Sequence, residues 1–186
     1  MRIIAGTHRG RALAAVGKGD PAAHLRPTTD RVRESLFGVL DGGRFGDPIE
    51  GAHVLDLFAG TGALGLEALS RGAAHGTFVE NGRKALSLLT QNIRSLGEGE
   101  RTRVLRQDAT RLGPAERACD LVFLDPPYGK GLGGRAIEVA RAGGWIAPDA
   151  LIVWEEAAAI DLLNGLTLLE TRRYGDTWIT LARNVA

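Results

Sequence analysis

The sequence predicts an α/β fold in which a mostly parallel sheet is covered by helices and ends in an antiparallel hairpin. Short apolar runs of strand character alternate with helical patterns between residues 53 and 163. A glycine turn, Gly60 to Gly65, follows the first of these strands and precedes a helix. Two more strand-like runs meet around Gly175-Asp176, which is typical of a hairpin.

The composition indicates one domain. The chain has 186 residues, of which 44% are hydrophobic, enough for a single well-buried core. Its one cysteine, Cys119, excludes an intrachain disulfide. No apolar run approaches the roughly 18 residues of a membrane span, and the N-terminus lacks the apolar core of a signal peptide. We therefore expect a soluble, cytoplasmic protein that binds no membrane.

The net charge of +1 conceals a basic N-terminal segment. Residues 1–35 hold seven basic and three acidic residues, a net charge of +4, which leaves −3 for the rest. A segment of this sign suits contact with phosphate groups, although a solvated surface explains the same charges. Within it, runs 2–6 and 11–16 are predicted to form a hairpin that leans on the main sheet or becomes ordered on a partner.

The other elements follow in order. Residues 17–27 contain two glycines and two prolines and predict a loop, and a helix runs from about Thr28 to Leu40. Thr28 either caps this helix or contacts a cofactor lying over the first sheet strand. The predicted sheet strands are 53–58, 77–80, 102–106, 121–124 and 151–154, with helices 64–71, 83–96 and 136–142 between them and a short helix 157–163 before the hairpin strands 166–174 and 177–181.

The end of the fourth strand carries the clearest chemical signal. Leu121 to Leu124 run into Asp125-Pro126-Pro127-Tyr128, and two prolines cannot continue a strand ladder. Ligands of parallel α/β sheets bind at the carboxyl ends of strands, so Asp125 and Tyr128 should lie at a site. Asp125 and the Pro126 carbonyl oxygen would accept hydrogen bonds from an amino group on a nucleobase, and Tyr128 would stack on that base. An ordinary proline turn is the alternative.

The glycine turn predicts a nucleotide-type cofactor. Read literally, Gly60 to Gly65 is the dinucleotide fingerprint, whose pyrophosphate would lie against the turn. Asp56 would repel a pyrophosphate but would accept hydrogen bonds from the amino-acid part of S-adenosylmethionine, which favours the methyl donor. Glu80 suits a ribose diol, and Asp108 is placed either for the adenine amino group or as a turn cap. The turn residues expected at the cofactor are Phe58, Gly60, Thr61 and Gly62.

The whole pattern is that of a Rossmann-like, seven-stranded class I methyltransferase sheet with an antiparallel last strand and a small N-terminal β-hairpin. The chain resembles the RsmD family, the guanine-N2 methyltransferases of small-subunit ribosomal RNA. The resemblance rests on segments 2–6, 25–34, 56–73 and 125–128 and covers nearly the whole chain. Its most specific part is Arg26-Pro27-Thr28-Thr29-Asp30-Arg31-Val32-Arg33-Glu34, and Tyr128 stands where some members have Phe.

This resemblance implies S-adenosylmethionine as donor and the exocyclic N2 of one guanine in 16S rRNA as acceptor, met in an assembled or assembling small subunit. It implies catalytic roles for Asp125, Pro126, Pro127 and Tyr128, with Glu80 at the ribose and Asp108 at the adenine. Residues 1–25 would form a basic RNA-contacting hairpin and loop, and residues 26–186 the methyltransferase domain. Expected RNA contacts are Arg2, His8, Arg9, Arg11, Arg26 and, in the glycine-rich loop 129–134, Lys130. We expect a monomer without metal, because the histidines have no ligand spacing.

Three other functions stay open at this point. The same chemistry serves adenine N6 in DNA or a glutamine amide in a protein, although the chain has no room for a separate DNA target-recognition domain. A nicotinamide-dependent oxidoreductase would need a second domain to hold its substrate. A non-catalytic RNA-binding protein would use the basic N-terminus and would not need Asp125.

Overall fold

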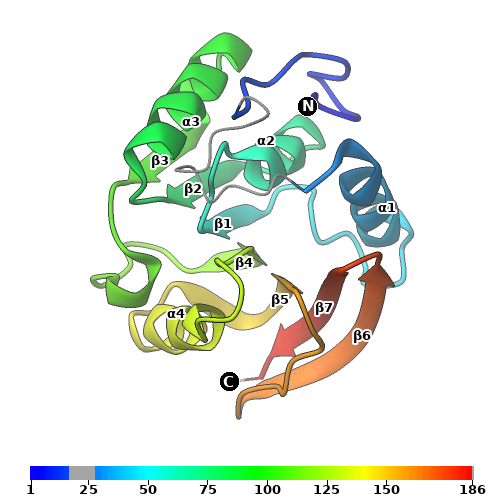
Figure 1. Ribbon diagram of the computed structural model, residues 1–186, viewed down its shortest axis with the longest axis vertical. Helices are drawn as coiled ribbons and strands as arrows, with labels where there is room; N and C mark the ends of the chain where they lie inside the picture. Colours follow the sequence, from blue (N-terminus) through cyan, green and yellow to red (C-terminus); the bar gives the residue numbers. More distant parts are fainter. Residues whose placement is uncertain (17–27, 186) are drawn as a thin grey trace.

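The structure is a computed structural model that describes residues 1–16 and 28–185. One seven-stranded sheet has the order β3-β2-β1-β4-β5-β7-β6 (Figure 1). β1 to β5 run parallel, and β7 is antiparallel to both of its neighbours. The strands are β1 (His53–Leu57), β2 (His75–Val79), β3 (Thr102–Leu105), β4 (Cys119–Leu124), β5 (Ile146–Glu156), β6 (Leu166–Tyr174) and β7 (Thr177–Asn184). The predicted α/β class with an antiparallel closing hairpin is confirmed.

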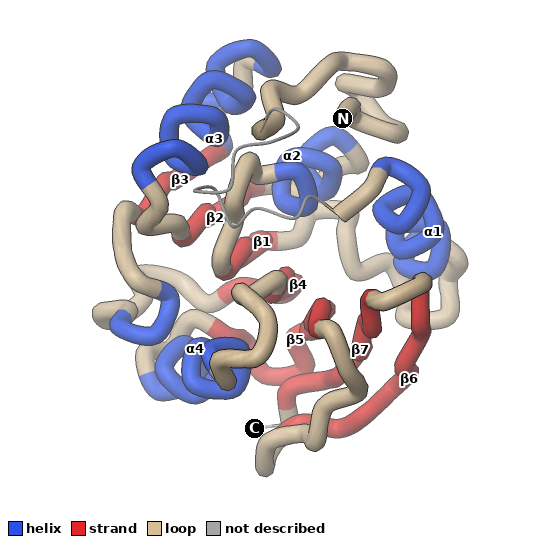
Figure 2. Tube along the Cα trace, in the orientation of Figure 1, coloured by secondary structure: helices blue, strands red, loops and turns tan. Residues whose placement is uncertain are grey.

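Helices cover both faces of this sheet (Figure 2). α1 (Asp30–Asp41), α2 (Ala63–Ser70) and α3 (Arg83–Leu96) lie on one face, and α4 (Leu132–Ala142) lies on the other. α1 begins where sequence predicts, because the hydroxyl of its N-cap Thr29 accepts a hydrogen bond from the backbone N of Val32. α3 ends at Gly97, whose φ of 73° closes the helix in a conformation that favours glycine.

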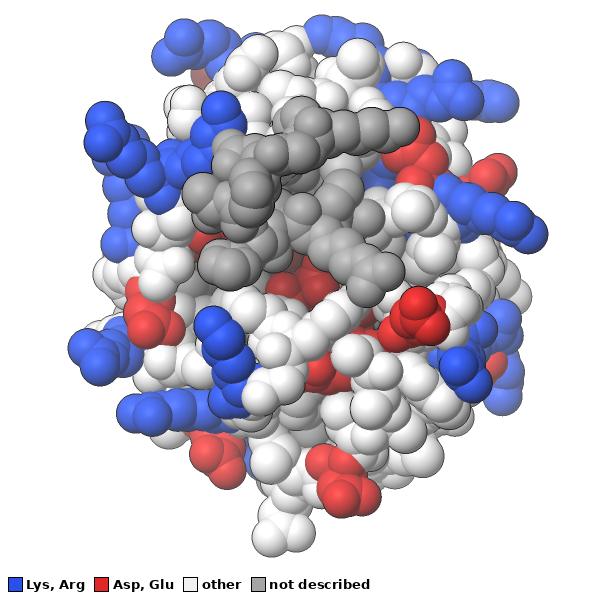
Figure 3. Space-filling model, in the orientation of Figure 1, with Lys and Arg blue, Asp and Glu red and all other residues white. Residues whose placement is uncertain are grey.

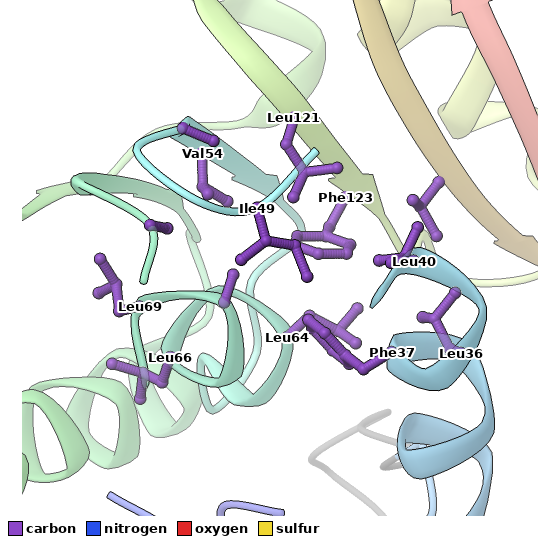
Figure 4. Packing of buried hydrophobic residues seen from close by; sticks show 14 of the residues in the cluster. Leu36, Phe37, Leu40, Ile49, Val54, Leu64, Leu66, Leu69, Leu121 and Phe123 are labelled. Carbon is purple, nitrogen blue, oxygen red and sulfur yellow. The ribbon is translucent and has the colours of Figure 1, made fainter. Parts of the chain in front are cut away.

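The core beneath α1 and α2 determines where the end of β4 lies. Phe37 and Leu40 of α1 pack there with leucines of α2 and with Phe123 of β4 (Figure 4). The ring centroids of Phe37 and Phe123 are 5.7 Å apart, and both residues are fully buried. Close packing of this kind holds α1 against the strand that leads to Asp125. The start of α1 is therefore placed next to the carboxyl end of β4.

Two glycines allow the start of α2 to approach the sheet. Gly62 has a φ of +81°, and a Cβ there would lie 2.4 Å from Leu89 Cδ1. A Cβ on Gly65 would lie 2.5 Å from the Phe78 ring. No other residue fits either position without displacing its neighbours. The glycine spacing read as a nucleotide fingerprint thus also serves helix-to-sheet packing.

Residues 1–16 fold over α2 and α3, not along the main sheet. The two arms of this segment form a short version of the expected hairpin, with one antiparallel bridge between Arg2 and Ala12 and flanking backbone hydrogen bonds from Ile3 N to Arg11 O and from Leu13 N to Met1 O at 2.9 and 3.0 Å. Glu67 of α2 takes the place of a ladder partner, because its carboxylate accepts hydrogen bonds from the backbone N of Ile4 and of Ala5 at 2.8 and 3.0 Å. Side chains of the body therefore satisfy backbone groups that a β-sheet would have paired.

The helix predicted at 157–163 is wrong, since these residues are irregular. Alanine and leucine favour a helix locally, but seven residues form a marginal one without tertiary support. Ile160 and Leu163 instead pack against the cluster under α4. The glycine-rich stretch is shorter than expected, because α4 already begins at Leu132.

Candidate active site

A cavity of about 550 Å³ opens where β1, β2 and β4 end. β1 and β4 are neighbours in the sheet, and the strand order reverses between them, which is where doubly wound folds bind ligands. Met1 and Val16 of the N-terminal segment also line this cavity. The cavity contains most of the site residues predicted from sequence: Thr28, Asp56, Phe58, Gly60, Thr61, Glu80, Asp125, Pro126, Pro127 and Tyr128.

Pairing of the strands brings the catalytic candidates to the turn that follows β1. Leu124 of β4 pairs with Leu57 of β1, so Asp125 and Phe58 leave the sheet at the same level. Phe58 has a φ of 59°, a left-handed conformation that is rare for an aromatic residue. Such strain is characteristic of functional sites, and here it turns the chain sharply from β1 into Gly60.

Glu80 is held rigidly between the glycine turn and α3. Its Oε2 accepts a hydrogen bond from the backbone N of Gly60 at 2.8 Å. Its Oε1 accepts hydrogen bonds from the backbone N of Asn81 and Gly82 at 2.9 and 2.7 Å. The carboxylate therefore has one fixed orientation, and Oε2, which accepts a single hydrogen bond, keeps a lone pair for a hydroxyl donor in the cavity.

Asp56 is the most deeply buried acid of the site. Its side chain is 2% exposed, and Oδ2 accepts a hydrogen bond from Gly65 N at 3.0 Å. Burial is the main cause that raises the pKa of Asp56 to about 8, and the charge of Glu80 adds to the shift. A cationic ligand group beside Asp56 would favour its ionised form.

This burial predicts an unusual dependence of stability on pH. Between pH 3.8 and about 8 the folded protein holds a proton on Asp56 that the unfolded chain has released, so the free energy of unfolding falls as pH rises. We expect the melting temperature of the ligand-free protein to decline by several degrees from about pH 5 to pH 8. In Asp56→Asn this decline should be shallower. An identical pH slope in both proteins would contradict the assignment.

Asp125 is the second acid whose pKa is raised. Burial is the largest cause that holds the pKa of Asp125 well above its usual range, followed by the charges of Glu155 and Asp56. Tyr128, three residues on, donates its hydroxyl hydrogen bond to Glu155 Oε1 at 3.1 Å. The ring of Tyr128 is thereby fixed at the cavity wall beside Asp125.

Two predicted cofactor residues lie elsewhere. Gly62 serves packing, as described above, and does not line the cavity. Asp108 is also outside the lining, and its Oδ1 accepts hydrogen bonds from the backbone N and the hydroxyl of Thr110, both at 2.8 Å. These bonds are the main cause that lowers the pKa of Asp108. Its position matches the turn-capping alternative, and its contact with adenine stays a prediction.

The residues expected to contact RNA differ in exposure and in their partners. Figure 3 shows acidic side chains near the centre and most basic side chains toward the edge. Arg2, Arg9 and Lys130 are exposed, whereas His8 Nε2 lies 2.6 Å from Glu98 Oε1. Arg26 lies outside the described residues. In the part of the chain that the structure describes, no cluster of His, Cys, Asp or Glu suits a metal ion, and no helix is long and apolar enough to span a bilayer.

Glu155 is a site residue that sequence reasoning missed. It lies in β5, where Trp154 pairs with Leu124 of β4, so Glu155 is next to Asp125 across the sheet. Its carboxylate is 5% exposed and accepts hydrogen bonds from Tyr128 and from the hydroxyl of Thr28. The sequence does contain a signal for Glu155, because this acidic residue follows an apolar strand as Asp125 does. The sequence does not show that Glu155 lies beside Asp125, because that depends on which strands are neighbours in the sheet.

The donor and acceptor groups of the cavity fit S-adenosylmethionine better than a dinucleotide. Three carboxylates, Asp56, Glu80 and Asp125, line one space. They match an ammonium group, a ribose diol and a positive sulfonium, because positive ligand groups favour the ionised carboxylates, whereas a pyrophosphate would oppose their ionisation. Arg83 and Lys84 also line the cavity, at the start of α3.

Fold and site together define a methyltransferase with a Rossmann-like sheet. A family model described as "Conserved hypothetical protein 95" matches residues 1–183, and the chain belongs to this family. The resemblance to the RsmD family is confirmed. Ribosomal RNA small subunit methyltransferase D of Escherichia coli K12 is 41% identical over 167 residues, which cover 89% of this chain and 77% of that protein.

Solved structures agree with this assignment. A provisionally named methyltransferase from Escherichia coli superimposes with a TM-score of 0.83 at 37% identity, covering 100% of this chain and 98% of that one. An RNA methyltransferase from Salinibacter ruber, solved with S-adenosyl-L-homocysteine, has a TM-score of 0.65 at 14% identity, covering 86% of this chain and 94% of that one. The second likeness shows the fold alone.

Proposed function

We propose that this protein transfers a methyl group from S-adenosylmethionine to the exocyclic N2 of a guanine in 16S rRNA of the small ribosomal subunit. Methylation of ribosomal RNA with this donor is the activity that the family and its named relatives support. The choice of guanine N2 follows the resemblance to the RsmD family, and the assignment of an amino group as the acceptor rests on one observation. The Asp125-Pro126-Pro127-Tyr128 turn opens into the cavity that Asp56 and Glu80 line.

Each side chain has a defined task in this reaction. Asp56 and Glu80 would hold the amino-acid and ribose parts of the donor, which supplies an electrophilic methyl group when bound. Asp125 and the carbonyl oxygen of Pro126 would accept hydrogen bonds from the two hydrogens of the guanine amine. That arrangement orients the nitrogen lone pair toward the methyl carbon, and Asp125 can take the proton that the amine releases.

Tyr128 would hold the plane of the base. Its hydroxyl is engaged by Glu155, so the face of the ring, not its polar tip, is presented to the base. Burial, together with the nearby Glu155 carboxylate, raises the pKa of Tyr128 to about 12, so the phenol stays protonated. A target nucleotide would have to be extruded from its surroundings to reach this position.

Residues around the cavity would hold the RNA. We propose that residues 1–25 contact the RNA backbone through exposed basic groups such as Arg2 and Arg9, and that the exposed Lys130, which follows the Asp125–Tyr128 turn, contacts it as well. The methyltransferase domain would then comprise residues 26–186. The structure supports close association of the two parts, because Met1 and Val16 line the same cavity as Glu80.

Product mapping tests this function. The protein would be incubated with labelled S-adenosylmethionine and, separately, undermethylated small subunits, free 16S rRNA and DNA. We expect label in N2-methylguanosine of 16S rRNA. Label in N6-methyladenosine, or in DNA alone, would contradict the proposed acceptor. Heat stabilisation by NAD and none by S-adenosylmethionine would contradict the proposed cofactor.

A further inference from the structure

A groove along the exposed side of α3 is separate from the residues already assigned to RNA contact. Its volume is about 640 Å³, and it lies between α3 and Arg106, the residue that follows β3. Arg83 and Arg94, near the two ends of α3, line it together with Arg106. Asn81 and Arg83 also line the active-site cavity, so the groove adjoins that cavity.

The three arginines of this groove lack acidic partners. All three are exposed, and within residues 1–16 and 28–185 no carboxylate forms an ion pair with any of them. Arg101 and Arg103, which lie nearby in the chain, are paired with Glu98 and Glu116. No acidic residue is among the described residues that line the groove. Figure 3 shows basic side chains at the upper left, over α3 and β3 of Figure 1. The groove therefore suits an anionic partner.

The side chains on α3 are spaced for an extended polyanion. Positions 83, 87, 90 and 94 line the groove and lie on one side of the helix, since they are three or four residues apart. The arginines at the two ends are separated by about 16 Å along the helix axis, so they would contact phosphates of different nucleotides. Ser87 and Gln91 between them offer neutral donors for phosphate oxygens.

The lining fits a nucleic-acid backbone better than a protein surface. Leu86 alone is apolar among the described lining residues, whereas the centre of a protein–protein interface is typically apolar. Guanidinium groups recognise phosphate oxygens by paired, charge-assisted hydrogen bonds, which carry no preference for base sequence.

We propose that this groove binds the sugar–phosphate backbone of the RNA substrate while the target nucleotide occupies the active-site cavity. The inference rests on the proposed function, because it takes RNA as the substrate. β3 lies three inter-strand spacings from β4, or about 14 Å. One RNA molecule can therefore reach the groove and the Asp125–Tyr128 turn at the same time.

Two variants test this contact, Arg94→Gln and Arg106→Gln. Both residues line the groove but not the active-site cavity, so these changes leave the lining of the donor site intact. The probes are polyuridylate, which contains no guanine, and undermethylated small subunits, with binding measured at several salt concentrations. We expect each variant to raise the Kd for both probes by about threefold to fivefold. The slope of log K against log salt concentration should become shallower by about 0.7 on polyuridylate, which corresponds to one lost phosphate contact.

Matched variants separate the groove from a general loss of charge. Arg117→Gln removes the same charge from an exposed residue just before β4, at the sheet edge opposite the cavity, and should bind both probes as the unaltered protein does. Arg94→Lys keeps the charge and should keep the salt slope. S-adenosylmethionine binding, measured by calorimetry, should stay within about twofold in every variant.

Each outcome decides one of the two proposals. Unchanged Kd and salt slope in Arg94→Gln and Arg106→Gln would overturn this inference while the proposed function stands. Weaker binding to small subunits but not to polyuridylate would place the groove against a ribosomal protein, and would overturn it too. A slope change of the same size in Arg117→Gln would also overturn it, because the effect would then be one of overall charge. A lack of label on guanine N2 would contradict the proposed function alone, because binding of polyuridylate does not depend on the methylated position.

Discussion

Asp125→Asn is expected to lower kcat for methyl transfer by about a thousandfold while leaving the fold intact. Loss of a positioned proton acceptor typically lowers the rate by about 10²–10⁴-fold. Asparagine keeps one acceptor oxygen but cannot accept the proton of the amine. Its NH2 group would also face the amine as a competing donor.

The Asp125→Asn variant should be at least as stable as the unaltered protein. Asp125 lies beside Glu155 and Asp56, and those charges help to raise its pKa. Replacing it with a neutral isostere removes that repulsion, so the melting temperature should be unchanged or higher. Single-turnover rates with saturating S-adenosylmethionine, together with thermal unfolding, would check both parts.

Asp120→Asn is the matched control for this variant. Asp120 lies near the opposite end of β4 and accepts a hydrogen bond from the backbone N of His53 at 2.9 Å, which asparagine can also do. It should retain full activity. If Asp125→Asn keeps more than about a tenth of the activity, Asp125 is not the proton acceptor or amine ligand proposed here.

Glu67→Ala is expected to destabilise the protein by about 3–5 kcal/mol, the largest stability effect of a single change. Glu67 is fully buried and accepts hydrogen bonds from two backbone N atoms of residues 1–16 and from Arg71 Nε at 2.8 Å. Its Oε2 also lies 3.6 Å from NH1 of Arg33, which is fully buried too. Removing the carboxylate leaves both backbone donors without their partner and Arg33 NH1 without its nearby charge, while Arg33 NH2 keeps its hydrogen bonds to Asp30 and to Arg2 O.

Denaturant unfolding would measure this loss. Glu116→Ala is the control, because Glu116 pairs with Arg103 on the surface, with side chains 77% and 43% exposed, and should cost less than about 1 kcal/mol. The double variant Arg33→Met, Glu67→Leu should recover part of the stability, since it removes both buried charges. A cost for Glu67→Ala no larger than for Glu116→Ala would show that the network does not hold the N-terminal segment.

Local signals were sufficient for much of the fold and cofactor site. Asp56, Glu80 and Asp125 were found because each lies at or just beyond the carboxyl end of an apolar strand, and parallel strands bring such ends to one edge. Predictions of secondary structure from local sequence were wrong or incomplete where tertiary contacts outweighed the intrinsic propensity of the residues. Residues 157–163 are irregular, and the short hairpin of residues 1–16 is held by the side chains of Glu67 and Asn92 instead of leaning on the main sheet.

The sequence by itself determined the class of fold, the glycine turn at residues 60–65 and the Asp125–Tyr128 turn, since each depends on a contiguous stretch of residues. Only the tertiary structure decided that Glu155 lies beside Asp125 and accepts a hydrogen bond from Tyr128. The physical reason is strand order. β5 pairs with β4 through hydrogen bonds that any strand backbone could make, so which side chains become neighbours depends on how the whole sheet assembles.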